Sequence, residues 1–256
     1  MANGSSSFLV LPTQPHGHTE STNGSSREPP CPRKQKSNPT TPGPDHPFRA
    51  FILSKINHLV TLRNNKTSNM KISFVTTNPH KFKEVKDILS DYPVELEHLD
   101  MEYEENHDAS LEEIARQAAA QLAQQLNKPI VLEDTGLFFE AYKNFPGALP
   151  KFVFETLGYR GILKLLDGEI RDAHFKTVAA FCAPGEKPQL FTGLMKGKIT
   201  EKVFDEDKDA MPYDRIFIPA GETKTISSMS LSKKNSFSQR GTAFRKFGEY
   251  IKNKFH

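Results

Sequence analysis

Two adjacent carboxylates, Glu133 and Asp134, follow a short apolar run and precede Thr135 and Gly136. Neighbouring ionised carboxylates repel each other unless a cation or a proton lies beside them. A site with oxygen ligands only, few of them from the protein, favours Mg²⁺, which keeps its waters and shares phosphate oxygens. The segment is a candidate magnesium site, and an ordinary Asp-Thr-Gly turn is the alternative.

A second polar group, Thr76, Thr77, Asn78 and Lys81, lies where a predicted strand gives way to a predicted helix. The first turn of a helix directs unpaired N–H groups and the positive end of its dipole outward. Neutral Thr and Asn donors with a lysine one turn into the helix suit a phosphate. Plain capping by Thr77 or Asn78, with a solvated lysine, is the alternative.

Two further segments precede predicted secondary structure. Residues 233–241 are polar and cationic and lead into an amphipathic C-terminal helix, so they form either an anion site or a solvated surface. Residues 211–219 read as a structured loop that enters a strand, where Asp214 is either a turn residue or an acid of the site.

The elements that must position these residues alternate along the chain. Periodicity predicts strands over 71–76, 94–99, 130–133, 173–183 and 189–200, and helices over 79–90, after Ser110, over 150–166 and from about 241. Ser110 is the predicted cap of the second helix, with Glu113 at the capping-box position. This order predicts one α/β domain with a mixed sheet.

The first 69 residues differ from the rest. Residues 1–69 are Ser- and Pro-rich and carry eight Lys and Arg against three Asp and Glu, within a chain of net charge +3. Such a segment buries too little apolar surface to offset its ordering entropy, so we expect a disordered basic extension, dispensable for catalysis. Residues 48–63 have an apolar helical face and few acids, as organellar transit peptides do, and a marginal helix is the alternative.

The remaining residues, 70–256, form the expected catalytic domain and lack the basic excess of a nucleic-acid binder. Two cysteines, Cys31 and Cys182, indicate neither a disulfide framework nor a metal site. No apolar run approaches the roughly 18 residues that span a bilayer. We therefore expect a cytoplasmic protein with no membrane or specific nucleic-acid partner, or an organellar one if the extension is a transit peptide.

Five segments occur together in a recognisable order. "TTNPHK", "EDTGL", "FPGALPKF", "PYDRIFIP" and "KKNSFSQRGTAF" resemble, in order and approximate spacing, the inosine triphosphate pyrophosphatase family, over about residues 71–253. The resemblance implies an elongated two-lobed α/β fold with a nucleotide in the central cleft, and a homodimer. It also implies Mg²⁺-dependent hydrolysis of ITP, dITP and XTP to nucleoside monophosphate and pyrophosphate, which removes non-canonical purine nucleotides.

The resemblance also implies roles for individual residues. Asp134 corresponds to the principal carboxylate of the Mg²⁺ site, with Glu133 beside it, and Glu105 is chosen over Glu104 as a third ligand. Catalysis is expected from Asp134, Glu133 and Lys81, and a carboxylate, Asp134 or Glu133, would orient or deprotonate the attacking water. Substrate contacts are expected from Thr76, Thr77, Asn78, Lys81, Lys151, Tyr213, Asp214, Lys234, Ser238, Gln239 and Arg240.

The chain departs from the family pattern in the base-binding segments. The family usually has Ser-His-Arg where this chain has Gln239, and an aromatic-Gly-aromatic-Asp-Pro run that Met211 and Pro212 interrupt. We expect Arg240 to read the C6 oxygen, which favours inosine and xanthosine triphosphates over ATP. We also expect weaker discrimination against GTP than is usual in the family, because Met211, Pro212 and Gln239 alter the pocket wall that would exclude the C2 amino group of guanine. A nucleotide sensor without turnover and a protein that binds nucleic acid through its basic extension are the competing hypotheses.

Overall fold

The computed structural model describes residues 69–103 and 109–255, which belong to the compact unit Thr61–His256. Its strands are β1 (Met70–Val75), β2 (Val94–Leu99), β3 (Ile130–Phe139), β4 (Pro146–Gly147), β5 (Asp172–Cys182), β6 (Gln189–Ile199) and β7 (Phe217–Pro219). Its helices are α2 (Pro79–Ile88), α3 (Leu111–Leu126), α4 (Pro150–Leu165), α5 (Leu231–Phe237) and α6 (Gln239–Phe255), with 3₁₀ turns η1 (Pro212–Arg215) and η2 (Ile226–Ser228).

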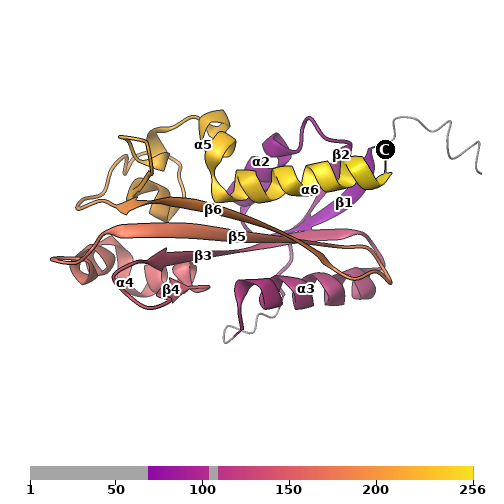
Figure 1. The fold of residues 1–256 in the computed structure, drawn as a ribbon, viewed down its shortest axis with the longest axis horizontal. Coiled ribbons are helices and arrows are strands. Elements are labelled where there is room, and N and C mark those ends of the chain that lie inside the picture. The colour runs from indigo at the N-terminus through magenta and orange to yellow at the C-terminus, as the bar shows by residue number, and fades with distance from the viewer. Residues whose placement is uncertain (1–68, 104–108, 256) are drawn as a thin grey trace, which may run out of the picture. The chain divides into compact units, whose positions relative to one another are not determined.

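The seven strands form one mixed sheet in the order β2-β1-β3-β5-β6-β7, with β4 paired to β3. β1 is parallel to β2 and β3, whereas β3, β5, β6 and β7 pair antiparallel. Helices α2 and α6 cover one face of the sheet and α3 covers the other (Figure 1). The predicted α/β fold with a mixed sheet is confirmed.

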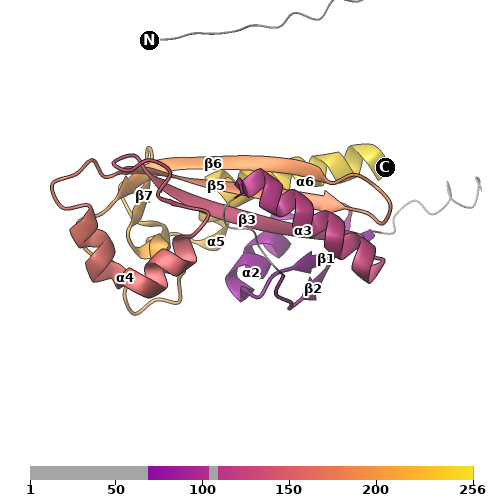
Figure 2. The same ribbon diagram turned by 90° about the horizontal axis from the view of Figure 1, so that it is seen from below.

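The core has three parts. On one face, aromatic side chains of β1, β5 and α6 pack together, among them Phe74, Phe181 and Phe247. On the other face, small alanines of α3 lie against the same strands. The third part lies at the opposite end of the long strands, where α4, η1 and β7 meet β3, β5 and β6 (Figure 2). The core is therefore concentrated at both ends of the sheet.

Local sequence explains where the helices begin. The Asn78 side chain accepts hydrogen bonds from the backbone N–H groups of His80 and Lys81, and Pro79 supplies a preset φ at the first turn of α2. Ser110 caps α3 through the N–H of Glu113, as predicted. Helix α4 has no side-chain cap, and Gly158, with φ of 59°, interrupts it.

The corner between α5 and α6 depends on close backbone approach. Ser238 ends α5, and its hydroxyl oxygen accepts from the N–H of Gly241 in the first turn of α6. A Cβ atom at Gly193 of β6 would lie 2.0 Å from the Gln239 carbonyl oxygen, so only glycine lets α6 begin against the sheet. None of the described helices is long and apolar enough to cross a membrane.

Candidate active site

A pocket of about 1070 Å³ lies beside the middle of β3. β1 pairs with β3 as far as Leu132, and β4 pairs with β3 from Leu137 onward. Neither of these strands covers this edge of β3 between the two positions, where Glu133, Asp134 and Thr135 lie along the pocket wall. The acidic segment therefore faces the pocket because the sheet is interrupted there.

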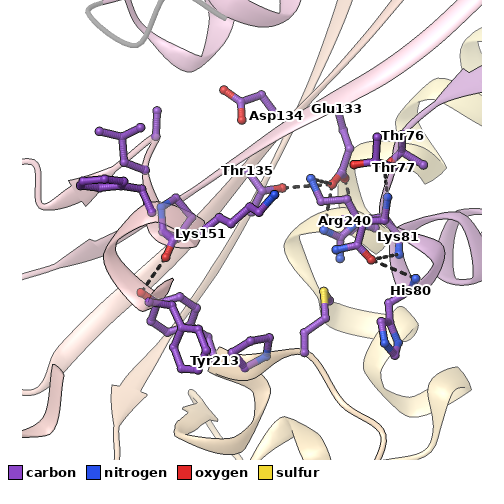
Figure 3. Close-up of a pocket in the computed structure, with 18 of the residues that line it drawn as sticks. Thr76, Thr77, His80, Lys81, Glu133, Asp134, Thr135, Lys151, Tyr213 and Arg240 are labelled. Atoms are coloured by element: carbon purple, nitrogen blue, oxygen red, sulfur yellow. Dashed lines mark hydrogen bonds and ion pairs between the residues drawn. The ribbon is translucent and has the colours of Figure 1, made fainter. Parts of the chain in front are cut away.

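The two ends of the pocket differ in chemistry. At one end are the loop after β1 and the first turn of α2, with Thr76, Thr77 and Lys81. At the other end, α4 and η1 contribute Lys151 and Tyr213 (Figure 3). The Phe154 ring of α4 also lines the pocket and packs against Tyr213, with 5.9 Å between the ring centroids. A polar, cationic end and an aromatic end suit a ligand that joins an anion to a flat ring.

The first turn of α2 is held by its cap. Thr76 Oγ1 accepts from the N–H of Asn78 at 3.1 Å, and Asn78 Oδ1 accepts from His80 and Lys81 at 2.9 and 3.3 Å. Capping by Asn78 is therefore confirmed, but Lys81 is not simply solvated, because its ammonium group lies 3.1 Å from Glu133. Phosphate binding, which would use the exposed Thr77 hydroxyl and the Lys81 ammonium group, stays a prediction.

A line of six buried or half-buried charged groups, hereafter the charge chain, connects the elements around the pocket. In order of contact, it comprises Asp214, Lys234, Glu84, Arg240, Glu133 and Lys81. Negative and positive groups alternate, so the three carboxylates and three cations balance. These six residues come from five elements, namely η1, α5, α2, α6 and β3. The charge chain therefore fixes these elements relative to one another.

Arg240 is the centre of the charge chain and only 1% exposed. Its Nε and Nη2 donate to the two oxygens of Glu133, both at 2.8 Å (Figure 3). Its Nη1 donates to Glu84 at 2.6 Å. Two parallel bonds from a guanidinium to one carboxylate form a strong, directional pair. The expected contact of Arg240 with the base stays a prediction, which only its remaining N–H groups could fulfil.

The pKa values within the charge chain follow from burial and from these ion pairs. Burial alone would raise the pKa of Glu133, but Arg240 and Lys81 lower it from 4.5 to about 2. The same balance of burial against Arg240 and Lys234 lowers the pKa of Glu84. Burial dominates at Asp214 and raises its pKa, although Lys234 opposes the shift. Glu133 is therefore ionised at neutral pH.

Asp134 is 7% exposed and points in a different direction from Glu133 (Figure 3). Glu133 already receives two bonds from Arg240 and lies 3.1 Å from Lys81 Nζ, so it is a counter-ion in this structure. Its expected role as a metal ligand stays a prediction. Among residues 69–103 and 109–255, no group of three or more His, Cys, Asp or Glu side chains could hold a metal ion. Glu105, the expected third ligand, lies outside the described residues.

Tyrosine hydroxyl groups join the walls of the aromatic end. Tyr213 of η1 donates to the Pro150 carbonyl at 3.0 Å, and Tyr159 of α4 donates to the Pro212 carbonyl at 2.9 Å. Burial raises the pKa of the Tyr213 hydroxyl, which stays protonated and remains a donor. These reciprocal bonds fix α4, and with it the exposed Lys151, against η1.

The pocket brings together most of the residues predicted from sequence. Those that line it are Thr76, Thr77, Asn78, Lys81, Glu133, Asp134, Lys151, Tyr213, Asp214, Gln239 and Arg240. Lys234 and Ser238 do not line it, because Lys234 lies in the charge chain and Ser238 caps α6. Sequence reasoning missed Glu84, whose only signal was a carboxylate beside the apolar stripe of α2.

Comparisons with known proteins agree on one family. The sequence profile of the Ham1 family matches residues 72–250. The chain is 43% identical over 185 residues to a dITP/XTP pyrophosphatase of Methanopyrus kandleri, covering 72% of this chain and 97% of that protein. It is 42% identical over 184 residues to the dITP/XTP pyrophosphatase of Thermococcus kodakarensis, covering 72% of this chain and 98% of that protein.

Solved structures share the fold. The Staphylococcus aureus Ham1 protein superposes with a TM-score of 0.58 at 24% identity, over 72% of this chain and 98% of that one. A HAM1 protein from Coxiella burnetii gives 0.60 at 22% identity, over 72% and 99% of the two chains. With the family profile and the archaeal relatives, these likenesses establish that the chain belongs to the Ham1 family.

Proposed function

We propose that this protein hydrolyses nucleoside triphosphates to nucleoside monophosphate and pyrophosphate, with ITP, dITP and XTP as preferred substrates. The observation that carries the proposal is one pocket with a cationic end and an aromatic end, joined by a buried acidic strand. Relatives named dITP/XTP pyrophosphatases, about 40% identical over nearly their whole length, support the same activity. The cellular role that follows is removal of non-canonical purine nucleotides.

The triphosphate would occupy the cationic end. Lys81 is half-buried, and its ammonium group has three donors, of which Glu133 takes one at 3.1 Å. The dipole of α2 favours an anion at the same place, and the Thr77 hydroxyl adds a neutral donor. Lys151 is exposed on the far wall, so it could contact a phosphate from the opposite side.

The side chains of the pocket fit a divalent cation such as Mg²⁺ at Asp134. The Asp134 carboxylate is buried in the pocket wall, and the exposed Glu102 lines the same pocket. One or two carboxylates that share the ion with substrate phosphates are the usual protein contribution to a Mg²⁺ site. Glu133 fits poorly because Arg240 holds both of its oxygens. The chemistry that the ion supplies when bound is neutralisation of phosphate charge.

Asp134 is also our choice for the group that orients the attacking water. A carboxylate with a pKa of about 2, as in Glu133, is a weak base near neutral pH. Glu133 instead pairs with the buried Arg240 and holds Lys81 in place, so that the positive charge of Lys81 faces the phosphates. In this assignment water attacks the α-phosphorus, and pyrophosphate leaves from the cationic end.

Pyrophosphate release tests the proposal. The purified protein is mixed with ITP, dITP, XTP, GTP and ATP in turn, with and without Mg²⁺, and kcat/KM is measured for each. We expect the highest values for ITP, dITP and XTP, lower values for GTP and the lowest for ATP. Binding of ITP without pyrophosphate release would instead favour a nucleotide sensor.

Replacing Lys81 by Ala is expected to lower kcat/KM for ITP by about 10² to 10³, the usual cost of one contact that stabilises transition-state charge. Lys83→Ala is the matched control, because Lys83 lies two residues along the same helix and is exposed. Circular dichroism would establish that both variants are folded. A folded Lys81→Ala protein with unchanged kcat/KM would contradict the phosphate role.

A further inference from the structure

Gln239 is the first residue of α6 and lines the pocket, although its side chain belongs to no part of the charge chain. The residue is only 4% exposed. It adjoins Ser238, which caps the helix, and Arg240, which pairs with two glutamates. Both neighbours therefore have structural partners that account for their burial.

The side-chain oxygen of Gln239, in contrast, has no hydrogen-bonding partner among the described residues. This atom, Oε1, is also buried. Buried polar atoms in folded proteins are nearly always partnered, because an acceptor withdrawn from water without a donor is unfavourable. A buried, unpartnered acceptor in the wall of a ligand pocket indicates that the ligand supplies the donor.

Close contacts hold the backbone that carries the Gln239 side chain in a defined place. Gly193 of β6 lies so close to Gln239 that a Cβ there would be 2.0 Å from the Gln239 carbonyl oxygen. The Ser238 hydroxyl fixes the same turn by accepting from the N–H of Gly241 at 3.0 Å. A buried side chain on a fixed backbone has little freedom left to lose when a ligand donor arrives, so it can discriminate between ligands.

We propose that Gln239 Oε1 accepts the hydrogen on N1 of a 6-oxopurine base, which makes Gln239 a specificity-determining residue. This inference rests on the proposed function. Hypoxanthine, xanthine and guanine all carry a hydrogen on N1, whereas N1 of adenine carries a lone pair that would face the Gln239 oxygen. Gln239 would therefore disfavour ATP without excluding GTP.

The test combines one substitution with one change of substrate. Gln239→Met preserves length and removes the acceptor, and Gln124→Met makes the same change on the exposed face of α3. The substrates are ITP and 1-methyl-ITP, which lacks the N1 hydrogen. Gln239→Met should lower kcat/KM for ITP about 10-fold, the size of one lost hydrogen bond, and leave kcat/KM for 1-methyl-ITP unchanged. Gln124→Met should leave both values unchanged.

Two outcomes would overturn the proposal: an equal loss on both substrates, or no loss on ITP. With ATP added as a third substrate, the second outcome has a specific form: a loss on ATP without a loss on ITP would assign the oxygen to the 6-amino group. In the ligand-free protein, Gln239→Met should leave the Tm unchanged or raise it, since the unpartnered acceptor is gone. A merely structural role would lower the Tm instead.

The proposed function and this inference fail in different ways. Absence of pyrophosphate release from ITP by the unchanged protein overturns the proposed function alone. Calorimetric binding of ITP and 1-methyl-ITP then decides the inference. Weaker binding of ITP alone to Gln239→Met supports it, and equal effects on both nucleotides, or no binding of ITP, contradict it.

Discussion

Replacing Arg240 by Met is expected to remove about 3–5 kcal/mol of unfolding free energy. The substitution leaves Glu84 and Glu133 buried, with one cation fewer, and it changes the charge chain from balanced to net negative. The loss is large compared with the roughly 5–15 kcal/mol that stabilises an ordinary domain. Urea denaturation followed by circular dichroism measures it directly.

Two control variants separate the loss of the buried ion pairs from the general effect of an Arg→Met substitution. Arg116→Met removes an exposed ion pair with Glu113, at 3.7 Å, and should cost at most about 1 kcal/mol. The double variant Arg240→Met, Glu133→Gln restores the balance of charges, so it should be more stable than Arg240→Met alone. A cost for Arg240→Met no larger than that for Arg116→Met would show that the charge chain contributes little to stability.

The dependence on pH provides a further check of the same variant. In the unchanged protein the folded-state pKa of Glu133 is about 2, below its ordinary value of 4.5. Glu133 therefore contributes stability that is fully present above about pH 4.5 and is lost as the pH falls toward 2. Without Arg240, burial favours the protonated carboxyl group. The difference in unfolding free energy between the two proteins should shrink as the pH falls from 7 to 3.

Much of the fold could be predicted because local pattern determines local structure. The strand over 94–99 was predicted with its observed bounds, and the Ser110 cap was identified from spacing alone. Gly158 and the short α5 were not foreseen, since a single glycine and a seven-residue cationic helix give little periodic signal. β3 was predicted to end at 133 but continues to Phe139, because β5 pairs with it across the acidic segment.

In the candidate site, local hydrogen bonds could be predicted from the sequence, whereas ion pairs between distant residues could not. Residues that bind through their own turn, such as Asn78, can be recognised in the sequence because their partners are two and three residues away. Ion pairs between residues far apart in the chain have no characteristic spacing in the sequence. Arg240 and Glu84 are 156 positions apart, and Lys234 and Glu84 are 150 apart. Most of the charged residues that line the pocket could therefore be predicted from the sequence, but the ion pairs between them could not.

The charge chain also changes what is expected of Asp134. From sequence, Asp134→Asn would relieve repulsion with Glu133 and could stabilise the protein. In the structure Arg240 and Lys81 already neutralise Glu133, so the gain in stability should be small. The principal effect of Asp134→Asn should instead be on turnover.

Asp134→Asn is expected to lower kcat/KM for ITP by at least about 10³ at saturating Mg²⁺, because one change removes both a metal ligand and the group assigned to orient water. Asp167→Asn, an identical change at an exposed position after α4, should leave kcat/KM and its Mg²⁺ dependence unaltered. Titrating Mg²⁺ at fixed ITP separates the roles: a weaker ligand raises the Mg²⁺ concentration needed for half-maximal rate, whereas a lost water contact lowers the maximal rate. Near-normal turnover by folded Asp134→Asn would contradict both roles. Glu133 would then be the remaining candidate for the carboxylate that orients the attacking water.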